Sequence, residues 1–472
     1  MNKKRFRLLI FSLGLVSFML ACNLLSGNVE PTSTPLPEPT QTPVPLATPT
    51  LEPPPPTEAP TEVVEETAPE LSVPEGELGT YALNWYQDNY GYWYVVGLLI
   101  NNTDRAVDDI EIEISALNAD GNSIYSEITY AALYNIAPGE ISPFTLSLWE
   151  EIPTVETFTA EIVGQSVTDI ARAEVEIRGT KMTMGNNYIN VTGEIVNNGD
   201  TPIEIGNIAA ATFGADGNIA TANYANALIS YLNPGASGPF CVSMDIPAEG
   251  AENITDFTIY TDVEVGDQED AYSVTYLGER NYYDSDGYFH LVGELLNDSD
   301  VNLNLALIAG IYDADGNVLD ASRLSMLPIS SLAPGESITY DFDYWNPMNN
   351  VENIFDIADS YTVQVDLGWT WDSSTVYVDI NTTDDSNEFD EFWGATFTGK
   401  VENNSGENLE GAVVIVNIYD PETGELLATG YTSLYDEIPN GETADYELTI
   451  SVEDGFDISA VNYTIIAKGE LP

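Results

Sequence analysis

The sequence is poor in the residues that most enzymes and metal sites use. Its 472 residues include one histidine, two cysteines and 12 Lys+Arg against 77 Asp+Glu, so the formal net charge is −65. A surface of this charge repels nucleic acid, which excludes a DNA- or RNA-binding role. A single imidazole excludes zinc sites built on two or more histidines. Cations, neutral ligands and protein partners remain open.

The first 21 residues have the features of an export signal. A basic start is followed by an apolar, acid-free stretch over residues 8–21. The stretch leads into the sequence Met-Leu-Ala-Cys, ending at Cys22, which resembles the lipobox of bacterial lipoproteins. The resemblance implies that residues 1–21 are removed and that Cys22 carries a diacylglyceryl group. The alternative is an uncleaved anchor, which is disfavoured because the 14 apolar residues are fewer than the ~20 that a bilayer span needs.

Residues 22–75 are predicted to form the lipidated N-terminus and an extended linker. Of the chain's 27 prolines, 14 lie between Pro31 and Pro74, interleaved with Thr and Glu. Proline favours the extended polyproline form, which has no core. With Cys22 lipidated, Cys241 is the only thiol left, so no intrachain disulfide forms. We expect a globular part anchored by lipid to the extracytoplasmic face of a cell membrane, at the cell surface, and stabilised by core burial alone.

Beyond the linker the chain repeats four ordered markers four times. They are Gly-x-x-x-Asn at spacings of 96, 100 and 106 residues, an Asp-Gly or Thr-Gly turn, a Pro-Gly or Asn-Gly turn, and an aromatic residue five positions later. The first glycine and the aromatic residue of each copy are Gly97 and Phe144, Gly193 and Phe240, Gly293 and Tyr340, and Gly399 and Tyr446. This order predicts four repeats, over residues 76–168, 169–266, 267–369 and 370–472.

The segments between the markers alternate apolar and polar residues with a period of two. In the first copy Trp93, Val95, Gly97 and Leu99 share one face. Asp-Gly between such segments predicts a tight hairpin, because glycine accepts the positive φ that the turn requires. Short strands and regular turns predict an all-β fold of four tandem antiparallel sandwiches. We expect contacts to lie mostly within each repeat, so that Gly97→Val or Gly293→Val destabilises one copy and spares its neighbours.

The third and fourth repeats carry a motif that resembles one of a known family. Ile-Tyr-Asp at residues 311–313 and 418–420 is similar to the end of the Phe-x-Leu-Tyr-Asp motif of FxLYD domains, and the Gly-x-x-x-Asn and Pro-Gly-Glu markers fit the same family. Those domains are immunoglobulin-like modules of bacterial exported proteins and lipoproteins. The resemblance implies Ig-like sandwiches and no known activity, and it carries over no catalytic residues.

Neither His290 nor Cys241 is expected to be catalytic. The alternation places Phe289 and Leu291 on the core face, so His290 is expected to point to solvent, and Cys241 is expected to be an exposed thiol opposite Phe240. The two residues lie in different repeats, and no positive charge near Cys241 in the sequence activates the thiol. Carboxylates are abundant, but 100-residue sandwiches seldom provide the cleft that a glycosidase pair needs. We expect a protein that is not an enzyme.

Calcium is the one cofactor for which the sequence offers candidate ligands. Asp313 and Asp315 stand one residue apart before a glycine, as do Asp284 and Asp286. Oxygen-rich turns of this kind suit Ca²⁺, although neither has the full spacing of an EF-hand loop. Aspartate before glycine is also ordinary hairpin chemistry. We expect turns without a bound cofactor and keep calcium at these four carboxylates as the alternative.

Aromatic residues are the remaining candidates for a binding role. Strands favour them for packing, whereas exposed rings offer a flat apolar face to a ligand. The candidates are Tyr81, Trp85, Tyr86, Tyr90, Tyr92, Trp93 and Tyr94, with Trp369, Trp371 and Trp393 near the last junction. The sequence predicts a non-enzymatic, lipid-anchored surface protein that acts as a scaffold, adhesion or binding array, with a surface protein or polysaccharide as partner. The alternative is a protein that binds carbohydrate or cell-wall polymer, with calcium as a candidate requirement.

Overall fold

The structure is a computed structural model that describes residues 73–472, except 150–151, 153, 186, 267–272, 325–326, 345–356, 367–374, 391–393 and 454–455. The chain divides into two compact units, residues 1–66 and 67–472, and every described residue belongs to the second. The described residues form antiparallel strands joined by turns, with short 3-10 helices at η1 (Ala251–Asn253) and η3 (Ile458–Ala460). The all-β prediction is confirmed.

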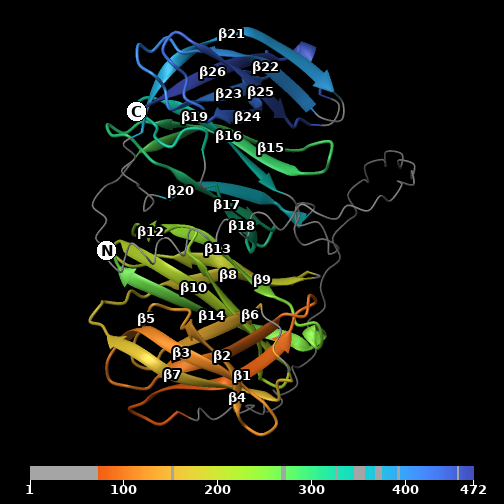
Figure 1. Cartoon of the computed structure of the whole chain (residues 1–472). Coiled ribbons are helices and arrows are strands. Elements are labelled where there is room, and N and C mark those ends of the chain that lie inside the picture. The colour runs from red at the N-terminus through yellow and green to blue at the C-terminus, as the bar shows by residue number, and fades with distance from the viewer. Residues whose placement is uncertain are drawn as a thin grey trace, which may run out of the picture. The chain divides into compact units, whose positions relative to one another are not determined.

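The strands fall into four groups that follow the repeats of the sequence (Figure 1). Residues 76–168 contain β1 (Leu78–Gln87), β2 (Trp93–Asn101), β3 (Val107–Leu117), β4 (Ser123–Tyr130), β5 (Asn135–Ile136), β6 (Ile141–Leu148) and β7 (Thr157–Val167). Residues 169–266 contain β8 (Glu176–Met184), β9 (Tyr188–Val196), β10 (Ile203–Gly214), β11 (Ile219–Asn226), β12 (Tyr231–Leu232), β13 (Ser237–Asp245) and β14 (Ile254–Val265). Residues 267–369 contain β15 (Val274–Tyr283), β16 (Phe289–Asn297), β17 (Ala306–Tyr312), β18 (Val318–Leu324), β19 (Ser337–Tyr344) and β20 (Ser360–Asp366). Residues 370–472 contain β21 (Val376–Asp390), β22 (Gly394–Glu402), β23 (Gly411–Tyr419), β24 (Leu426–Leu434), β25 (Thr443–Ile450) and β26 (Asn462–Leu471).

The same order of strand pairing recurs along the chain. One group of three strands, which we call the front sheet, is β1-β2-β6, then β8-β9-β13, β15-β16-β19 and β21-β22-β25. The other group, the back sheet, places β3 between β4 and β7, β10 between β11 and β14, β17 between β18 and β20, and β23 between β24 and β26. In the last repeat the long strand β21 pairs with both β22 and β26, so its front and back sheets are continuous.

Apolar side chains of a front sheet and a back sheet meet in a common cluster. In the first repeat Val95 and Leu99 of β2 and Phe144 of β6 pack with Ile112 and Ile114 of β3. Corresponding clusters form around the aromatic markers of the other three repeats, Phe240, Tyr340 and Tyr446. Two sheets that face each other across an apolar core form a sandwich-like arrangement.

The predicted hairpins at the second marker are confirmed. The strand pairs β3–β4, β10–β11, β17–β18 and β23–β24 are antiparallel and joined by these turns. The turn glycines Gly121, Gly217, Gly316 and Gly424 have φ values of 76°, 77°, 80° and 74°. Glycine reaches this left-handed region at no steric cost, which is why it recurs at this point.

The first glycine and the aromatic marker recur together because they touch. Gly97 of β2 lies opposite Phe144 of β6, and a Cβ built on Gly97 would lie 2.3 Å from Cζ of the ring. The ring is 1% exposed, so it has no free space into which to move. The other copies have the same pairing, Gly193 with Phe240, Gly293 with Tyr340, and Gly399 with Tyr446.

The asparagine of the first marker is a buried crosslink. Nδ2 of Asn101 donates to the main-chain oxygens of Arg105 at 2.8 Å and Ile136 at 2.9 Å, and Oδ1 accepts from N of Thr103 at 3.1 Å. The amides of Asn197, Asn297 and Asn403 make the equivalent three contacts. All four side chains are fully buried, and a buried amide is favourable only when its hydrogen bonds are made. The asparagine therefore ties the end of a front strand to the main chain just before the Pro-Gly or Asn-Gly turn.

Candidate functional site

Three front sheets are buried on both faces, which the alternation in the sequence did not predict. β2 is buried from Val95 to Asn101, and β9 is buried from Ile189 to Val196. The cause is the following repeat. Strand β11 contacts β1, β2 and β6, strand β18 contacts β8, β9 and β13, and strand β24 contacts β15, β16 and β19. Each of these three junctions therefore buries residues of two repeats, and the expectation that neighbours are independent is wrong there.

The apolar part of the first junction forms a cluster of its own. Val96 and Leu98, which point away from the core of the first repeat, pack with Ala211, Ile219 and Ala222 of the second. Oη of Tyr86 lies 2.6 Å from Oγ1 of Thr221 and 3.1 Å from the main-chain oxygen of Asp245. The junction thus combines apolar burial with hydrogen bonds between the two repeats.

The few cations of the chain are concentrated at these junctions. Eight Lys and Arg follow residue 21, and every one of them, all in the described part, takes part in an ion pair. Asp262, only 2% exposed, pairs with Arg172 and accepts from the main-chain N of Tyr134 at 2.9 Å in the preceding repeat. Burial raises the pKa of Asp262 to about 6, although the charge of Arg172 opposes the shift. Pairs that cross a repeat boundary are Arg172–Glu140, Lys181–Asp313, Arg280–Glu453 and Lys468–Glu336, together with the exposed pair Arg105–Asp169.

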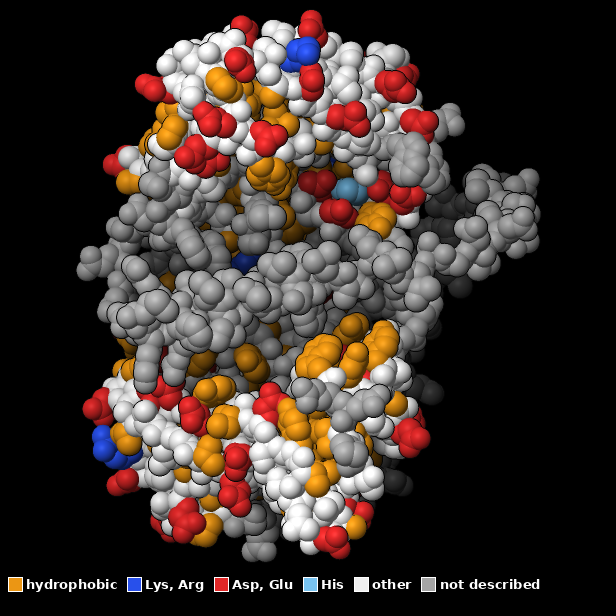
Figure 2. All heavy atoms as spheres, viewed as in Figure 1, with side chains coloured by type: hydrophobic (Ala, Val, Ile, Leu, Met, Phe, Trp, Pro, Cys, Tyr) orange, Lys and Arg blue, Asp and Glu red, His pale blue; other side chains and the backbone are white. Residues whose placement is uncertain are grey.

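His290 does not point to solvent, and that expectation is wrong. Its side chain is buried, and its ring stacks on Tyr282 with centroids 4.8 Å apart. Nδ1 lies 2.9 Å from Oδ2 of Asp341, and Nε2 lies 3.5 Å from Oδ2 of Asp284. Figure 2 shows this single histidine among acidic side chains. The outer face of its strand is covered by β24 of the following repeat, and Tyr282 beside it donates to the main-chain oxygen of Ser451 in that repeat.

The surroundings of His290 predict a stability that falls as pH rises. Burial alone lowers its pKa, but the hydrogen bond and charge of Asp341, with the charges of Asp343 and Asp284, outweigh burial and raise it. A raised pKa means that the folded state favours the protonated ring. The stabilisation is therefore complete below the ordinary pKa of 6.5 and is lost as pH rises through the folded pKa, with a slope of up to about 1.4 kcal/mol per pH unit.

Thermal unfolding of the full chain between pH 6 and pH 9 tests this expectation. The wild type should lose stability toward pH 9, and His290→Gln should remove that part of the pH dependence while leaving the fold at pH 9 intact. Because the chain has one histidine, no other imidazole contributes to the difference. Parallel pH profiles for the two proteins would contradict the assignment.

Cys241 is likewise not an exposed thiol. It faces away from the core of its own repeat, as expected, but packs against Tyr312, Val318 and Ala321 of the third repeat and is half-buried. Burial raises the pKa of the thiol well above its ordinary value, and the charge of Asp320 adds to the shift. A thiol held in the protonated form is a poor nucleophile, so the site does not activate Cys241.

The Asp-Gly loops use their carboxylates as hydrogen-bond acceptors within the protein. Oδ1 of Asp313 accepts from the main-chain N of Asp315 at 3.1 Å and of Asn317 at 2.8 Å, and Oδ2 lies 3.2 Å from Nζ of Lys181. Burial raises the pKa of Asp313, but the bonds from Asn317 and Lys181 outweigh it and lower the pKa. In the parts of the chain that the structure describes, no group of three or more His, Cys, Asp or Glu is arranged to hold a metal ion. These contacts favour turns, and calcium binding stays a prediction.

Asp284, in the other loop, has a similar turn role. Its Oδ1 accepts from the main-chain N of Asp286 at 3.0 Å and of Tyr288 at 2.8 Å. Asp88 has the same two contacts in the first repeat, with N of Tyr90 and of Tyr92, both at 2.9 Å. Both aspartates also bridge to the following repeat, so the loop serves the junction.

The aromatic segment 81–94 is divided among three surroundings. Trp85 and Trp93 pack against the core of the first repeat, and Tyr86 stacks on Tyr94 at the junction, with centroids 5.3 Å apart. Tyr90 and Tyr92 instead remain on the surface, 66% and 37% exposed. The sequence could not separate these roles, because all of these residues are typical of strands. Trp369, Trp371 and Trp393 lie outside the described residues.

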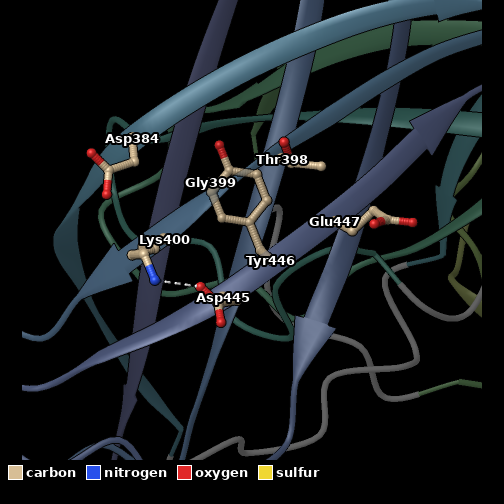
Figure 3. Close-up of a pocket in the computed structure, with 7 residues that line it drawn as sticks. All are labelled: Asp384, Thr398, Gly399, Lys400, Asp445, Tyr446 and Glu447. Atoms are coloured by element: carbon tan, nitrogen blue, oxygen red, sulfur yellow. Dashed lines mark hydrogen bonds and ion pairs between the residues drawn. The ribbon is translucent and has the colours of Figure 1, made fainter.

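The outer face of the last front sheet carries a shallow hollow (Figure 3). Asp384, Thr398, Lys400, Asp445 and Glu447 line it, together with Gly399 and Tyr446. Nζ of Lys400 lies 2.7 Å from Oδ1 of Asp445, so its one cation is already paired. The corresponding faces of the first three repeats are covered by a following strand. A polar terminal face is what a stacked array needs to stay soluble, and the hollow offers no nucleophile with an adjacent base.

Other predicted features fall outside the described residues or are not matched by known proteins. Residues 1–21, Cys22 and most of the linker 22–75 are not described, and the described residues contain no helix long and apolar enough to cross a membrane. No family model and no curated protein matches the chain. The FxLYD and lipobox resemblances therefore stay predictions.

Similarity to solved structures is weak. A calcium-binding mutant of beta-glucuronidase 2 from Bacteroides uniformis is 10% identical, with 52% of this chain and 26% of that chain covered and a TM-score of 0.11. The native conformation of alpha-2-macroglobulin from E. coli is 10% identical, with 81% and 28% covered and a TM-score of 0.13. The chain spans about a quarter of each of these proteins, and such scores carry no argument about function.

Proposed function

We propose that this chain is a lipid-anchored surface protein without enzymatic activity, in which four Ig-like sandwiches of the FxLYD type form a scaffold, adhesion or binding array. The sandwiches correspond to residues 76–168, 169–266, 267–369 and 370–472, and Cys22 carries the lipid. The observation that supports the proposal best is the junction, because the same strand of a following repeat covers the same front sheet three times. A stack of this kind offers an extended surface rather than a catalytic cleft.

The placement of the reactive residues supports a role without catalysis. His290 is buried at a junction, Cys241 is half-buried beneath β18, and Asp313 is engaged by Lys181. These groups lie where one repeat contacts the next. Function in such an array depends on which exposed groups it displays.

The lipid anchor is tested by metabolic labelling of bacteria that express the full chain with an alkyne-bearing fatty acid. The wild type is expected to take up the label and to sediment with membranes, and Cys22→Ser is expected to lose both properties. Cys241→Ser is the matched control, because it removes the other cysteine and should keep the label. Label that persists in Cys22→Ser, or fails to enter the wild type, would overturn the proposed anchor.

A further inference from the structure

Two exposed rings are in contact beside the hairpin between β1 and β2, and a third exposed ring lies on the same hairpin. Trp149, which follows β6, is 67% exposed and lies against Tyr92, with ring centroids 4.9 Å apart and planes at 48°. Tyr90, two residues before Tyr92 on the same hairpin, is 66% exposed. Figure 2 shows hydrophobic side chains on the surface where β1, β2 and β9 lie. Tyr90, Tyr92 and Trp149 are called the hairpin patch below.

The hairpin patch is held in place by contacts within and between repeats. The buried carboxylate of Asp88 accepts from the main-chain N of both Tyr90 and Tyr92. Nδ2 of Asn187, from the second repeat, donates to Oη of Tyr90 at 3.2 Å. The hairpin that carries Tyr90 and Tyr92 is therefore held in place before any ligand arrives, which lowers the entropic cost of binding.

We propose that the hairpin patch binds a neutral polysaccharide chain, a role that rests on the proposed surface display and names its partner. Tyr and Trp bury about 150–250 Å² each, so three partly exposed rings offer far less than the ~800 Å² per partner of a stable protein interface. Sugar rings match that small area, because they have an apolar face for an aromatic ring and hydroxyls for the tyrosine and amide groups at its edge.

Charge decides between neutral and anionic polysaccharides. The net charge of the chain is −65, and the segment from residue 22 to residue 104, which contains both tyrosines, has no Lys or Arg. An anionic polymer would meet repulsion from this excess of acids, and the hairpin itself supplies no counter-charge. A neutral chain meets no such repulsion. The amides of Asn89 and Asn187 lie beside each other, and that of Asn187 lies beside the Tyr90 hydroxyl, which provides polar groups for the hydroxyls of the sugar.

The sequence of the third repeat contains a related pair of residues. Tyr288 and Trp345 stand five positions before Gly293 and five after Tyr340, as Tyr92 and Trp149 do relative to Gly97 and Phe144. Trp345 lies outside the described residues and forms no part of the proposed site. Because the same Tyr and Trp pair occurs at the same positions in the first and third repeats, we infer that it has a function in the first repeat.

Native electrophoresis of the full lipidated chain in detergent tests the proposal. The gels contain hydroxyethyl cellulose, galactomannan or a β-1,3-glucan, with polygalacturonate as the anionic comparison. At least one neutral polymer is expected to retard the wild type, and Trp149→Ala and Tyr90→Ala are each expected to weaken apparent binding about tenfold or more. Tyr435→Ala is the matched control, because Tyr435 is 89% exposed on another repeat and its loss should change nothing.

Circular dichroism of each variant separates lost binding from lost folding. The proposal is overturned if no neutral polymer retards the chain, if polygalacturonate alone does so, or if the folded Trp149→Ala variant binds like the wild type. Incorporation of the fatty-acid label at Cys22 does not depend on any of these outcomes. Failure of the polysaccharide site is therefore distinguishable from failure of the lipid anchor.

Discussion

Gly97→Val is expected to destabilise the first repeat by about 3 kcal/mol, the upper end of the usual range for an overpacked core. A Cβ at this position would lie 2.3 Å from Cζ and 2.8 Å from Cε1 of Phe144, distances that no side-chain adjustment of the valine relieves. Either β2 and β6 separate or the ring leaves the core. Hydrogen exchange of the full chain measures the effect repeat by repeat, which a single melting temperature does not.

The spread of the damage distinguishes stacked repeats from independent ones. Because Val96 and Leu98 of the same strand pack on Ala211 and Ile219, protection should also fall in β10 and β11, while the third and fourth repeats keep theirs. Loss confined to the first repeat would restore the expectation of independent neighbours. Unchanged protection throughout would show that the contact between Gly97 and Phe144 is not needed.

A double-mutant cycle identifies the clash as the cause. Phe144→Ala alone is expected to cost about 3–5 kcal/mol, because it empties a fully buried site. If the valine acts by colliding with this ring, Gly97→Val should cost much less in that background, with a coupling of about 1 kcal/mol or more. Additive losses would assign the effect to the backbone of β2 instead.

The fold could be predicted where local rules decide it. Asp-Gly at residues 120–121 determines a hairpin by the φ that glycine accepts, and the alternation of Val95, Gly97 and Leu99 determines which face enters the core. The two markers Gly97 and Phe144 were visible in the sequence as separate features. Their contact was not, because register between β2 and β6 depends on the intervening strands rather than on either residue.

The junctions could not be predicted because they use the face that alternation assigns to solvent. His290 and Cys241 are opposite the core residues of their strands, as expected, yet the following repeat covers both. Val96 and Leu98 were the available signal, since two apolar residues on an outer face indicate a partner. The outer face of β16 carries Val292 and Leu296 beside His290, so the same signal was present there, although it does not say which strand covers the histidine.

Because the chain is so acidic, the Lys and Arg side chains at a junction contribute strongly to the stability of that junction. With 77 acids and 12 bases, an Arg or Lys lost from a junction leaves like charges facing each other rather than an exchangeable partner. Lys181 and Arg280 both reach an acid of the following repeat, while Arg172 and Lys468 reach an acid of the preceding one. Scarce positive charge is thereby used to hold repeats together.

Arg323→Ala is expected to be among the most destabilising single changes at a junction. Arg323 pairs with Asp366, whose side chain is fully buried, and donates to the main-chain oxygen of Leu228 in the second repeat. Burial lowers the pKa of Arg323, and the charge of Asp366 opposes the shift. Removing one partner of a buried pair leaves an uncompensated charge, which costs about 3–5 kcal/mol.

A matched pair of controls separates this buried charge from ordinary surface electrostatics. Arg178 pairs with Glu194, but its side chain is 53% exposed, so Arg178→Ala should cost less than about 1 kcal/mol. The double variant Arg323→Met with Asp366→Asn should recover much of the lost stability, because it removes both charges. In the wild type Oδ1 of Asp366 accepts from the main-chain N of Ser230 at 2.9 Å, and the amide oxygen of the asparagine can keep this bond. Protection in β17 and β18 should follow the same order, and equal losses for Arg178→Ala and Arg323→Ala would show that burial of the pair does not govern the second junction.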